Sequence, residues 1–225
     1  MSDVLPKILW LKEKNFLNKY KILIPNFKNR FQKYTSLDIT DKIQMVGKDN
    51  HLLINNGYYI PEFYPSGLPR LKNLLKLRNF FLKKYKCQFG NQKIYISRKI
   101  SGRRRLKNEN KLIRLLKKRN FKILFMENLN FKDQVIESAK SKLIVSVHGA
   151  GLTNLIWMKK KSKIIELRDQ HDITLNPYFV LCQKLGIYYN YFLTNKSLIN
   201  KINPHNNYVL NIKEFIKRHE KLLSS

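Results

Sequence analysis

The chain has 225 residues, enough for one large domain or two small ones. Apolar residues make up 43% of it, which excludes wholesale disorder, and no apolar run approaches the ~18 residues that a membrane-spanning helix needs. Basic residues outnumber acidic ones by 45 to 15, which gives a formal net charge of +30.

Three explanations compete for this charge: binding to nucleic acid, attraction to an anionic membrane surface, and the Lys/Asn/Ile-rich composition that A/T-rich coding produces. The lysines are spread along the whole length, which favours the compositional explanation, with peripheral inner-membrane contact as a possible consequence and no specific nucleic-acid partner. The N-terminus lacks the pattern of a signal peptide, and Cys87 and Cys182 match no metal or redox spacing. We therefore expect a cytoplasmic protein with two reduced cysteines.

The first third predicts short alternating elements. We expect a helix at 4–14, strands at 21–25 and 42–46, and a hairpin pairing 51–54 with 58–60 across Asn55-Asn56-Gly57. An irregular stretch at 61–69 precedes a helix at 71–85, and a linker follows at 87–92.

From residue 93 the pattern becomes regular. Strands are predicted at 93–97, 122–126, 143–147, 163–167 and 188–192, and helices at 108–119, 131–139, 151–158, 176–185 and 212–223. This alternation predicts a Rossmann-like, doubly wound parallel sheet. We place a short, truncated N-terminal α/β domain at 1–88 and the Rossmann-like domain at 89–225.

The segment from Val145 to Asn154 is the most informative. An apolar strand ends on His148, the turn Gly149-Ala150-Gly151 follows, and a helical pattern begins with Thr153 and Asn154. Ligands of open parallel sheets bind at the carboxyl ends of strands, and glycine permits both close approach and positive φ. The turn is therefore a candidate phosphate site, with a purely structural turn as the alternative.

Two further strand ends carry polar groups. Arg98, Arg103 and Arg104 follow the strand at 93–97, and arginine forks bind phosphate oxygens. A solvated basic loop is the alternative. Glu166 lies near the end of the strand at 163–167, where it suits a ribose hydroxyl or a pairing with Arg168.

These residues together resemble glycosyltransferase family 61. The likeness rests on Ser97-Arg98, the arginine loop with Asn108-Glu109, Phe131-x-x-Gln134, His-Gly-Ala-Gly-Leu-Thr-Asn at 148–154, and Ile-Glu-Leu at 165–167. It is specific over 93–167 and looser in the first third and at 208–211. The family includes bacterial capsular-polysaccharide enzymes and plant and animal transferases.

The resemblance implies a GT-B-like enzyme, in which two Rossmann-like domains face each other and the C-terminal one holds the nucleotide. It implies inverting transfer of a sugar from a nucleotide sugar, a UDP-sugar by preference, to a glycan or glycolipid acceptor, without a cofactor or an essential metal. Donor contacts would come from the residues matched by position: Arg98, Arg103, Arg104, Gly149, Gly151, Thr153, Asn154 and Glu166. His148 would be the catalytic base or a hydrogen-bond partner of the donor.

Residues 1–88 are shorter than the ~100 residues of a complete Rossmann domain, so we expect a reduced acceptor side. Bacterial surface-polysaccharide synthesis is the expected role. A nucleic-acid-binding module is one alternative, with the aromatic run at 188–192 as its best support, and an inactive relative that acts as a scaffold is another.

Overall fold

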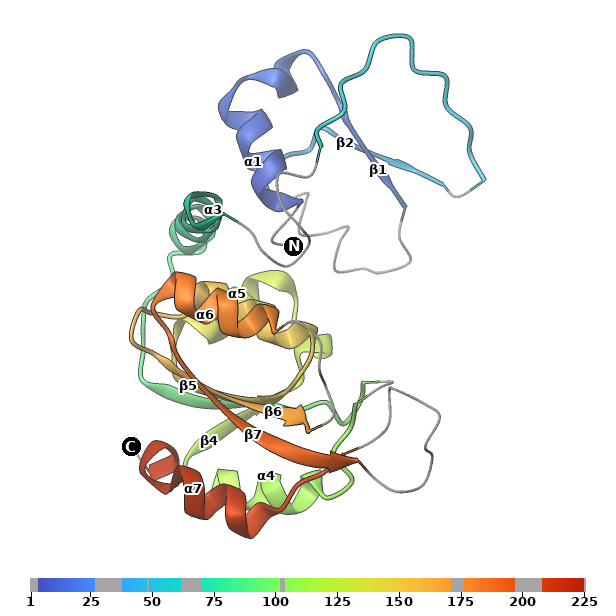
Figure 1. Cartoon of the computed structure of the whole chain (residues 1–225). Helices are drawn as coiled ribbons and strands as arrows, with labels where there is room; N and C mark the ends of the chain where they lie inside the picture. The colour runs from blue at the N-terminus through green and yellow to red at the C-terminus, as the bar shows by residue number, and fades with distance from the viewer. Residues whose placement is uncertain are drawn as a thin grey trace. The chain divides into compact units, whose positions relative to one another are not determined.

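A computed structural model describes residues 4–26, 38–47, 49–61, 70–101, 104–170, 176–196 and 208–224. The chain divides into two compact units, residues 1–81 and 82–225, and the division falls inside a helix, α3. Figure 1 shows the elements of both units along the chain.

The N-terminal unit contains short elements. They are α1 (Leu5–Glu13), the 3₁₀ turn η1 (Phe16–Asn18), β1 (Ile22–Pro25), β2 (Ile43–Val46) and most of α3 (Leu71–Lys84). Strands β1 and β2 pair in parallel, with Ile22 opposite Ile43. The helices predicted at 4–14 and 71–85 and the strands predicted at 21–25 and 42–46 are confirmed within one or two residues.

The hairpin predicted at 51–60 is wrong. Residues 51–60 form no strand, and Leu53 and Tyr59 are 93% and 85% exposed. The Asn-Asn-Gly turn chemistry is present and both flanks are apolar, but most of their side chains are exposed, so little packing supports a hairpin here. Most of the irregular stretch predicted at 61–69 lies outside the described residues.

The C-terminal unit is built on a six-stranded sheet. Its strands are β3 (Gln92–Ile96), β4 (Phe121–Leu124), β5 (Ser141–Val147), β6 (Lys163–Asp169), β7 (Tyr188–Lys196) and β8 (Tyr208–Val209). The order is β4-β3-β5-β6-β7-β8, in which the first five strands are parallel and β8 is antiparallel to β7. The predicted parallel sheet is confirmed, whereas periodicity alone missed the two-residue strand β8.

Helices cover both faces of this sheet. They are α4 (Glu109–Lys117), α5 (Phe131–Ala139), α6 (Pro177–Leu185) and α7 (Ile212–Ser224), with 3₁₀ segments η2 (Met126–Asn128) and η3 (Ala150–Trp157). Figure 1 shows α4 and α7 below the sheet and α5 and α6 above it. The unit is therefore a doubly wound, Rossmann-like α/β layer structure.

Alternation along the strands decides which side chain meets which layer. Leu143, Val145 and Val147 of β5 join the buried cluster that contains Leu112 of α4 and Phe215 of α7. In β6, Ile165 and Leu167 belong to the same cluster. Glu166 between them must point to the opposite face, where η3 and α6 pack, because successive side chains of a strand alternate. The alternation thus places the carboxylate of Glu166 on the face of the sheet that η3 and α6 cover, near the carboxyl end of β6.

Candidate active site at the carboxyl edge of the sheet

The chain order of the sheet reverses between β3 and β5. From β3 the chain passes to β4 at one edge, and it then returns across β3 to β5 and proceeds to β6 and β7. Such a switch point opens a crevice at the carboxyl ends of the two strands, and doubly wound proteins bind ligands there. Arg98 follows β3 and His148 follows β5, so the structure brings these two predicted residues to the switch point.

Arg98 lies directly against the backbone of Gly149. A Cβ atom placed on Gly149 would be 2.1 Å from Nη1 of Arg98, and Nη2 of Arg98 donates to Oγ of Ser101 at 2.9 Å. The φ of Gly149 is 162°, which is extended backbone, so this residue does not use the positive φ that glycine permits. Gly149 is required because the guanidinium occupies the space of a side chain.

The charge around Arg98 suits an anion. Burial, and after it the positive charge of Arg104, lowers the pKa of the Arg98 guanidinium. Arg104 holds a left-handed φ of 56°, which is uncommon for a residue with a side chain. The two cations repel each other in a half-buried position. An anionic group that binds between them relieves this repulsion and is therefore bound favourably. Arg103, the third predicted arginine, lies outside the described residues.

A buried carboxylate holds the backbone at Arg98. Oε1 of Glu109, which begins α4, accepts from the Tyr95 hydroxyl at 2.8 Å, from Oγ of Ser97 at 2.9 Å and from the backbone N–H of Arg98 at 3.2 Å. Glu109 is 3% exposed, and burial together with its charge raises the pKa of Tyr95 well above 10.0. Glu109 therefore fixes the turn that carries the arginine.

His148 is oriented by Glu166. Nδ1 of His148 lies 2.5 Å from Oε1 of Glu166, whose side chain is fully buried, while the His148 side chain is 15% exposed. In the neutral ring this contact makes Nδ1 the donor and leaves the lone pair on Nε2. A carboxylate behind an imidazole also stabilises the imidazolium that forms when Nε2 accepts a proton, as in catalytic triads.

The second oxygen of Glu166 accepts hydrogen bonds from a residue of β7 and from the residue that caps α6. Oε2 accepts from the Tyr189 hydroxyl at 2.5 Å and from Nδ2 of Asn176 at 3.4 Å. Burial and the charge of Glu166 raise the pKa of Tyr189, so this phenol stays a donor. The carboxylate has no exposed surface and supports His148, while the ribose contact predicted for it stays a prediction.

Asn176 and Tyr178 complete the wall beside His148. Oδ1 of Asn176 caps α6 by accepting from the backbone N–H groups of Tyr178 and Phe179. The Tyr178 ring meets the His148 ring edge-on, with centroids 5.2 Å apart, and burial raises the pKa of its hydroxyl, which is hydrogen-bonded to Thr153. Sequence reasoning did not select Asn176, Tyr178 or Tyr189. An asparagine directly before a proline predicts a helix cap, but its carboxylate partner is visible only in the fold.

Two of the predicted donor residues have internal packing roles. Nδ2 of Asn154 donates to Oε1 of Gln134 at 3.0 Å, and Oδ1 accepts from Nε1 of Trp157 at 3.1 Å, so this buried amide joins η3 to α5. A Cβ atom on Gly151 would be 3.2 Å from Cγ2 of Ile96, so this glycine lets η3 pack tightly on β3. Donor contacts by the side chain of Asn154 or the backbone of Gly151 stay predictions.

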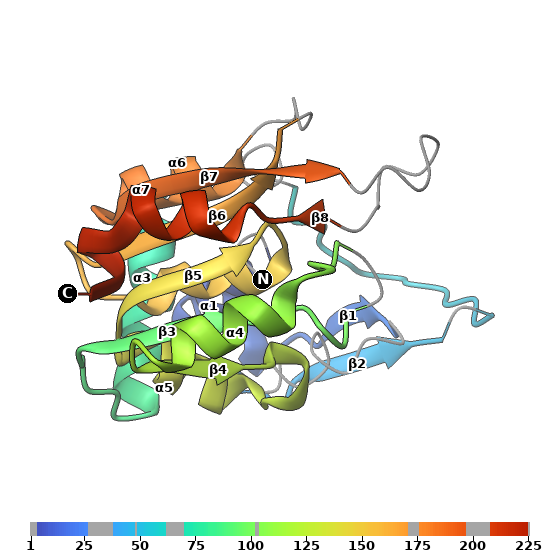
Figure 2. The same ribbon diagram turned by 90° about the horizontal axis from the view of Figure 1, so that it is seen from below.

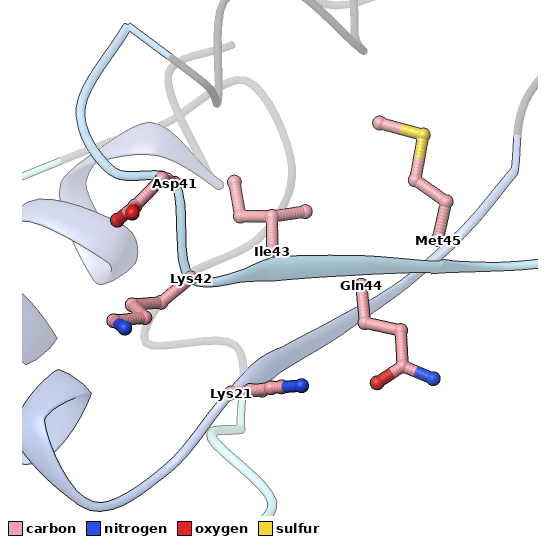
Figure 3. Close-up of a pocket in the computed structure, with 6 residues that line it drawn as sticks. All are labelled: Lys21, Asp41, Lys42, Ile43, Gln44 and Met45. Atoms are coloured by element: carbon pink, nitrogen blue, oxygen red, sulfur yellow. The ribbon is translucent and has the colours of Figure 1, made fainter.

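A cavity of about 560 Å³ lies elsewhere, in the N-terminal unit along β2. Figure 3 shows Ile43 and Met45 on one side of the strand and Lys42 and Gln44 on the other. Its polar groups do not converge on one point, and none of the predicted site residues lines it. The switch-point edge is therefore the better candidate site.

The fold and this edge define a Rossmann-like α/β protein with an oriented histidine and a half-buried arginine at its switch point. The family model described as Glycosyltransferase 61 matches residues 1–165. The chain belongs to this glycosyltransferase family, as the sequence resemblance indicated, and the family supports glycosyltransferase activity. A search of curated proteins finds no match.

Among the described residues, no helix has the length and apolar character to cross a bilayer. In the same part of the chain, no group of three or more His, Cys, Asp or Glu residues is arranged to hold a metal ion.

Proposed function

We propose that the chain is an inverting glycosyltransferase of the GT-B type that moves a sugar from a nucleotide-sugar donor, a UDP-sugar by preference, to a glycan or glycolipid acceptor in bacterial surface-polysaccharide synthesis. Family membership supports the transferase class. The observation that carries the mechanism is the contact of 2.5 Å between His148 and the buried Glu166 at the switch point, beside Arg98.

The proposed reaction is a single displacement at the anomeric carbon. An acceptor hydroxyl oxygen forms a bond to that carbon while the bond to the diphosphate oxygen breaks, and the electron pair leaves with the diphosphate. Nε2 of His148 takes the proton of the hydroxyl, and Glu166 stabilises the resulting imidazolium. Attack on the face opposite the leaving group inverts the anomeric configuration.

Arg98 and Arg104 would bind the leaving diphosphate. Negative charge accumulates on this group as the bond breaks, and preorganised cations in a half-buried site stabilise it more than water does. Arginine stays charged through the reaction and offers a planar fork of donors to the phosphate oxygens. The residues described at this edge can therefore stabilise the leaving group with protein cations, which is the basis for proposing a metal-independent enzyme.

The test is donor hydrolysis or transfer with a panel of nucleotide sugars, using the full chain and four variants. Arg98→Ala and His148→Ala should each lower the rate a hundredfold or more, because they remove leaving-group and proton-transfer chemistry. The matched controls are Lys99→Ala, a neighbouring exposed cation, and His51→Ala, an exposed histidine, and both should keep the parent rate. Equal rates in all variants would remove the site assignment, and a folded chain without activity toward any donor would favour an inactive scaffold.

A further inference from the structure

The amino-terminal edge of the six-stranded sheet, opposite the candidate active site, is strongly basic. In Figure 2 the arrowheads of the parallel strands point to one side, and the turns that precede the strands lie on the other. Basic residues fill these turns: Lys-Lys-Arg at 117–119, Lys140 and Lys142, and three consecutive lysines at 159–161. We call these residues the amino-edge cluster.

Backbone and side-chain contacts confirm that these turns are neighbours. The backbone N–H of Gln92 donates to the carbonyl of Lys140, and that of Lys161 donates to the carbonyl of Gly186 at 2.8 Å. The stem of Lys160 lies against Gly186, where a Cβ atom would be 3.0 Å from Cγ of the lysine. The hydroxyl of Ser162 also donates to the carbonyl of Ser141 at 3.4 Å, so the turns at 140–142 and 159–161 lie side by side at this edge.

Like charges crowd this edge. Burial lowers the pKa of Lys93, at the start of β3, and the positive charges of Lys142 and Arg119 lower it further. Two ion pairs of the described residues lie here, between Glu220 and Arg119 and between Glu137 and Lys122. Lysine at helix C-termini is explained by the helix dipole, but the lysines at 159–161 and at the starts of strands are not. The fold therefore brings lysines from several separate turns together at this edge, although basic residues are spread along the whole chain.

We propose that the amino-terminal edge of the six-stranded sheet is a docking surface for an anionic phospholipid bilayer. The parallel strands begin nearly in register, with Lys93 opposite Phe121 and Lys163 opposite Tyr188, so the turns before them share one edge that can meet a planar partner. The cluster is almost entirely lysine, a point charge suited to a surface of mobile headgroups, whereas readers of nucleic acid favour arginine forks. Phe89 and Tyr188, which are 46% and 56% exposed, precede or begin strands at the same edge and provide rings suited to the interfacial region.

Docking in this way would direct the candidate active site away from the bilayer. The seven residues of β6 connect the two edges. The six steps from its first to its last residue span about 20 Å, at ~3.3 Å per step. An acceptor bound at the His148 edge would then be a glycan that projects from the membrane. The docking proposal itself does not depend on the proposed activity.

The experiment is flotation of the full chain with vesicles of pure phosphatidylcholine and with vesicles that contain 30% phosphatidylglycerol, at ~0.15 M salt. Two triple variants carry the same change in charge. One replaces the edge lysines, as Lys159→Gln, Lys160→Gln and Lys161→Gln. The other replaces exposed lysines of α4 and α7, as Lys111→Gln, Lys213→Gln and Lys217→Gln.

We expect binding to the anionic vesicles alone, and a loss of about a hundredfold in affinity in the edge variant, which corresponds to about 1 kcal/mol per lysine. The control variant should keep its affinity within a few-fold. Equal losses in both variants would reduce the effect to net charge and overturn the proposal, as would absence of binding to anionic vesicles. Displacement of the chain from vesicles by stoichiometric RNA, with RNA affinity lost in the edge variant, would reassign the surface to nucleic acid.

Discussion

Substituting Gly149 with alanine should disable Arg98 without disturbing the fold. The new Cβ atom would lie 2.1 Å from Nη1 of Arg98, and ordinary van der Waals contact begins near 3.4 Å, so the guanidinium must move by about 1.3 Å. Such a shift is enough to break a charge-assisted hydrogen bond to a phosphate oxygen. Since a bond of this kind contributes about 1.5–3 kcal/mol, nucleotide affinity should fall roughly 10- to 150-fold.

Stability should respond differently from affinity. Gly149 has extended backbone, which alanine adopts without strain, and the atoms that its Cβ would meet belong to a flexible side chain. Alanine also reduces the entropy of the unfolded chain, by about 0.4–1 kcal/mol at compatible positions. Thermal unfolding should therefore show an unchanged or slightly higher Tm.

A double-mutant cycle read by isothermal titration with nucleoside diphosphates tests the cause. In the Arg98→Ala background the new Cβ atom meets no guanidinium. Gly149→Ala should then lower nucleotide affinity by less than about a factor of two. Gly47→Ala, whose Cβ would only touch the side chain of Asn50 at 3.4 Å, is the control and should bind normally. Full affinity in Gly149→Ala, or an undiminished effect of this change without Arg98, would refute the reasoning.

Three further predictions concern buried groups. Glu109→Ala leaves the donors of three hydrogen bonds without their acceptor, so urea unfolding should show a loss of about 3 kcal/mol or more, and a loss under 1 kcal/mol would contradict the structure. Burial lowers the pKa of His219 below its ordinary value of 6.5. Between the folded-state pKa and 6.5 the unfolded chain binds more protons than the folded chain. The contribution to stability is therefore full above pH 6.5 and is lost as the pH drops through the folded-state pKa. His219→Phe should flatten this fall between pH 7 and pH 5, and an identical pH profile of Tm would contradict the assignment. Burial raises the pKa of Cys182 to about 12, so native Cys182 should resist iodoacetamide at pH 8 and react only after unfolding, and rapid native labelling, identified by mass spectrometry, would be inconsistent with its packing.

The elements of the C-terminal unit were predictable because their signals are local. Runs such as Leu143 to Val147 are buried on both faces, and Asn176-Pro177 marks a helix start, so sequence patterns position strands and helices within a few residues. The same reasoning failed at residues 51–60, where turn chemistry was present but most of the apolar side chains stay exposed. Local pattern predicts an element only when the fold also buries it.

The candidate site was predictable only in part. Arg98 and His148 were found because strand ends of a parallel sheet converge on one edge. The contacts of Glu166 were not predicted. Its hydroxyl partner, Tyr189, lies 23 residues away on the neighbouring strand, and the sequence does not show how the two strands are aligned. Gly149 was selected because glycine allows close approach to the backbone, but that Arg98 takes this space depends on how two loops approach each other, which the sequence does not show.

The most direct test of the account is the binding of UDP, GDP and CMP to the purified chain, measured by isothermal titration at ~0.15 M salt in the parent, Arg98→Ala and Lys99→Ala. The account predicts micromolar binding of one nucleotide class, lost at least tenfold in Arg98→Ala and kept in Lys99→Ala. Weak binding of every nucleotide alike, equally reduced by both substitutions, would show only the +30 charge of the chain and would contradict a donor site at the switch point.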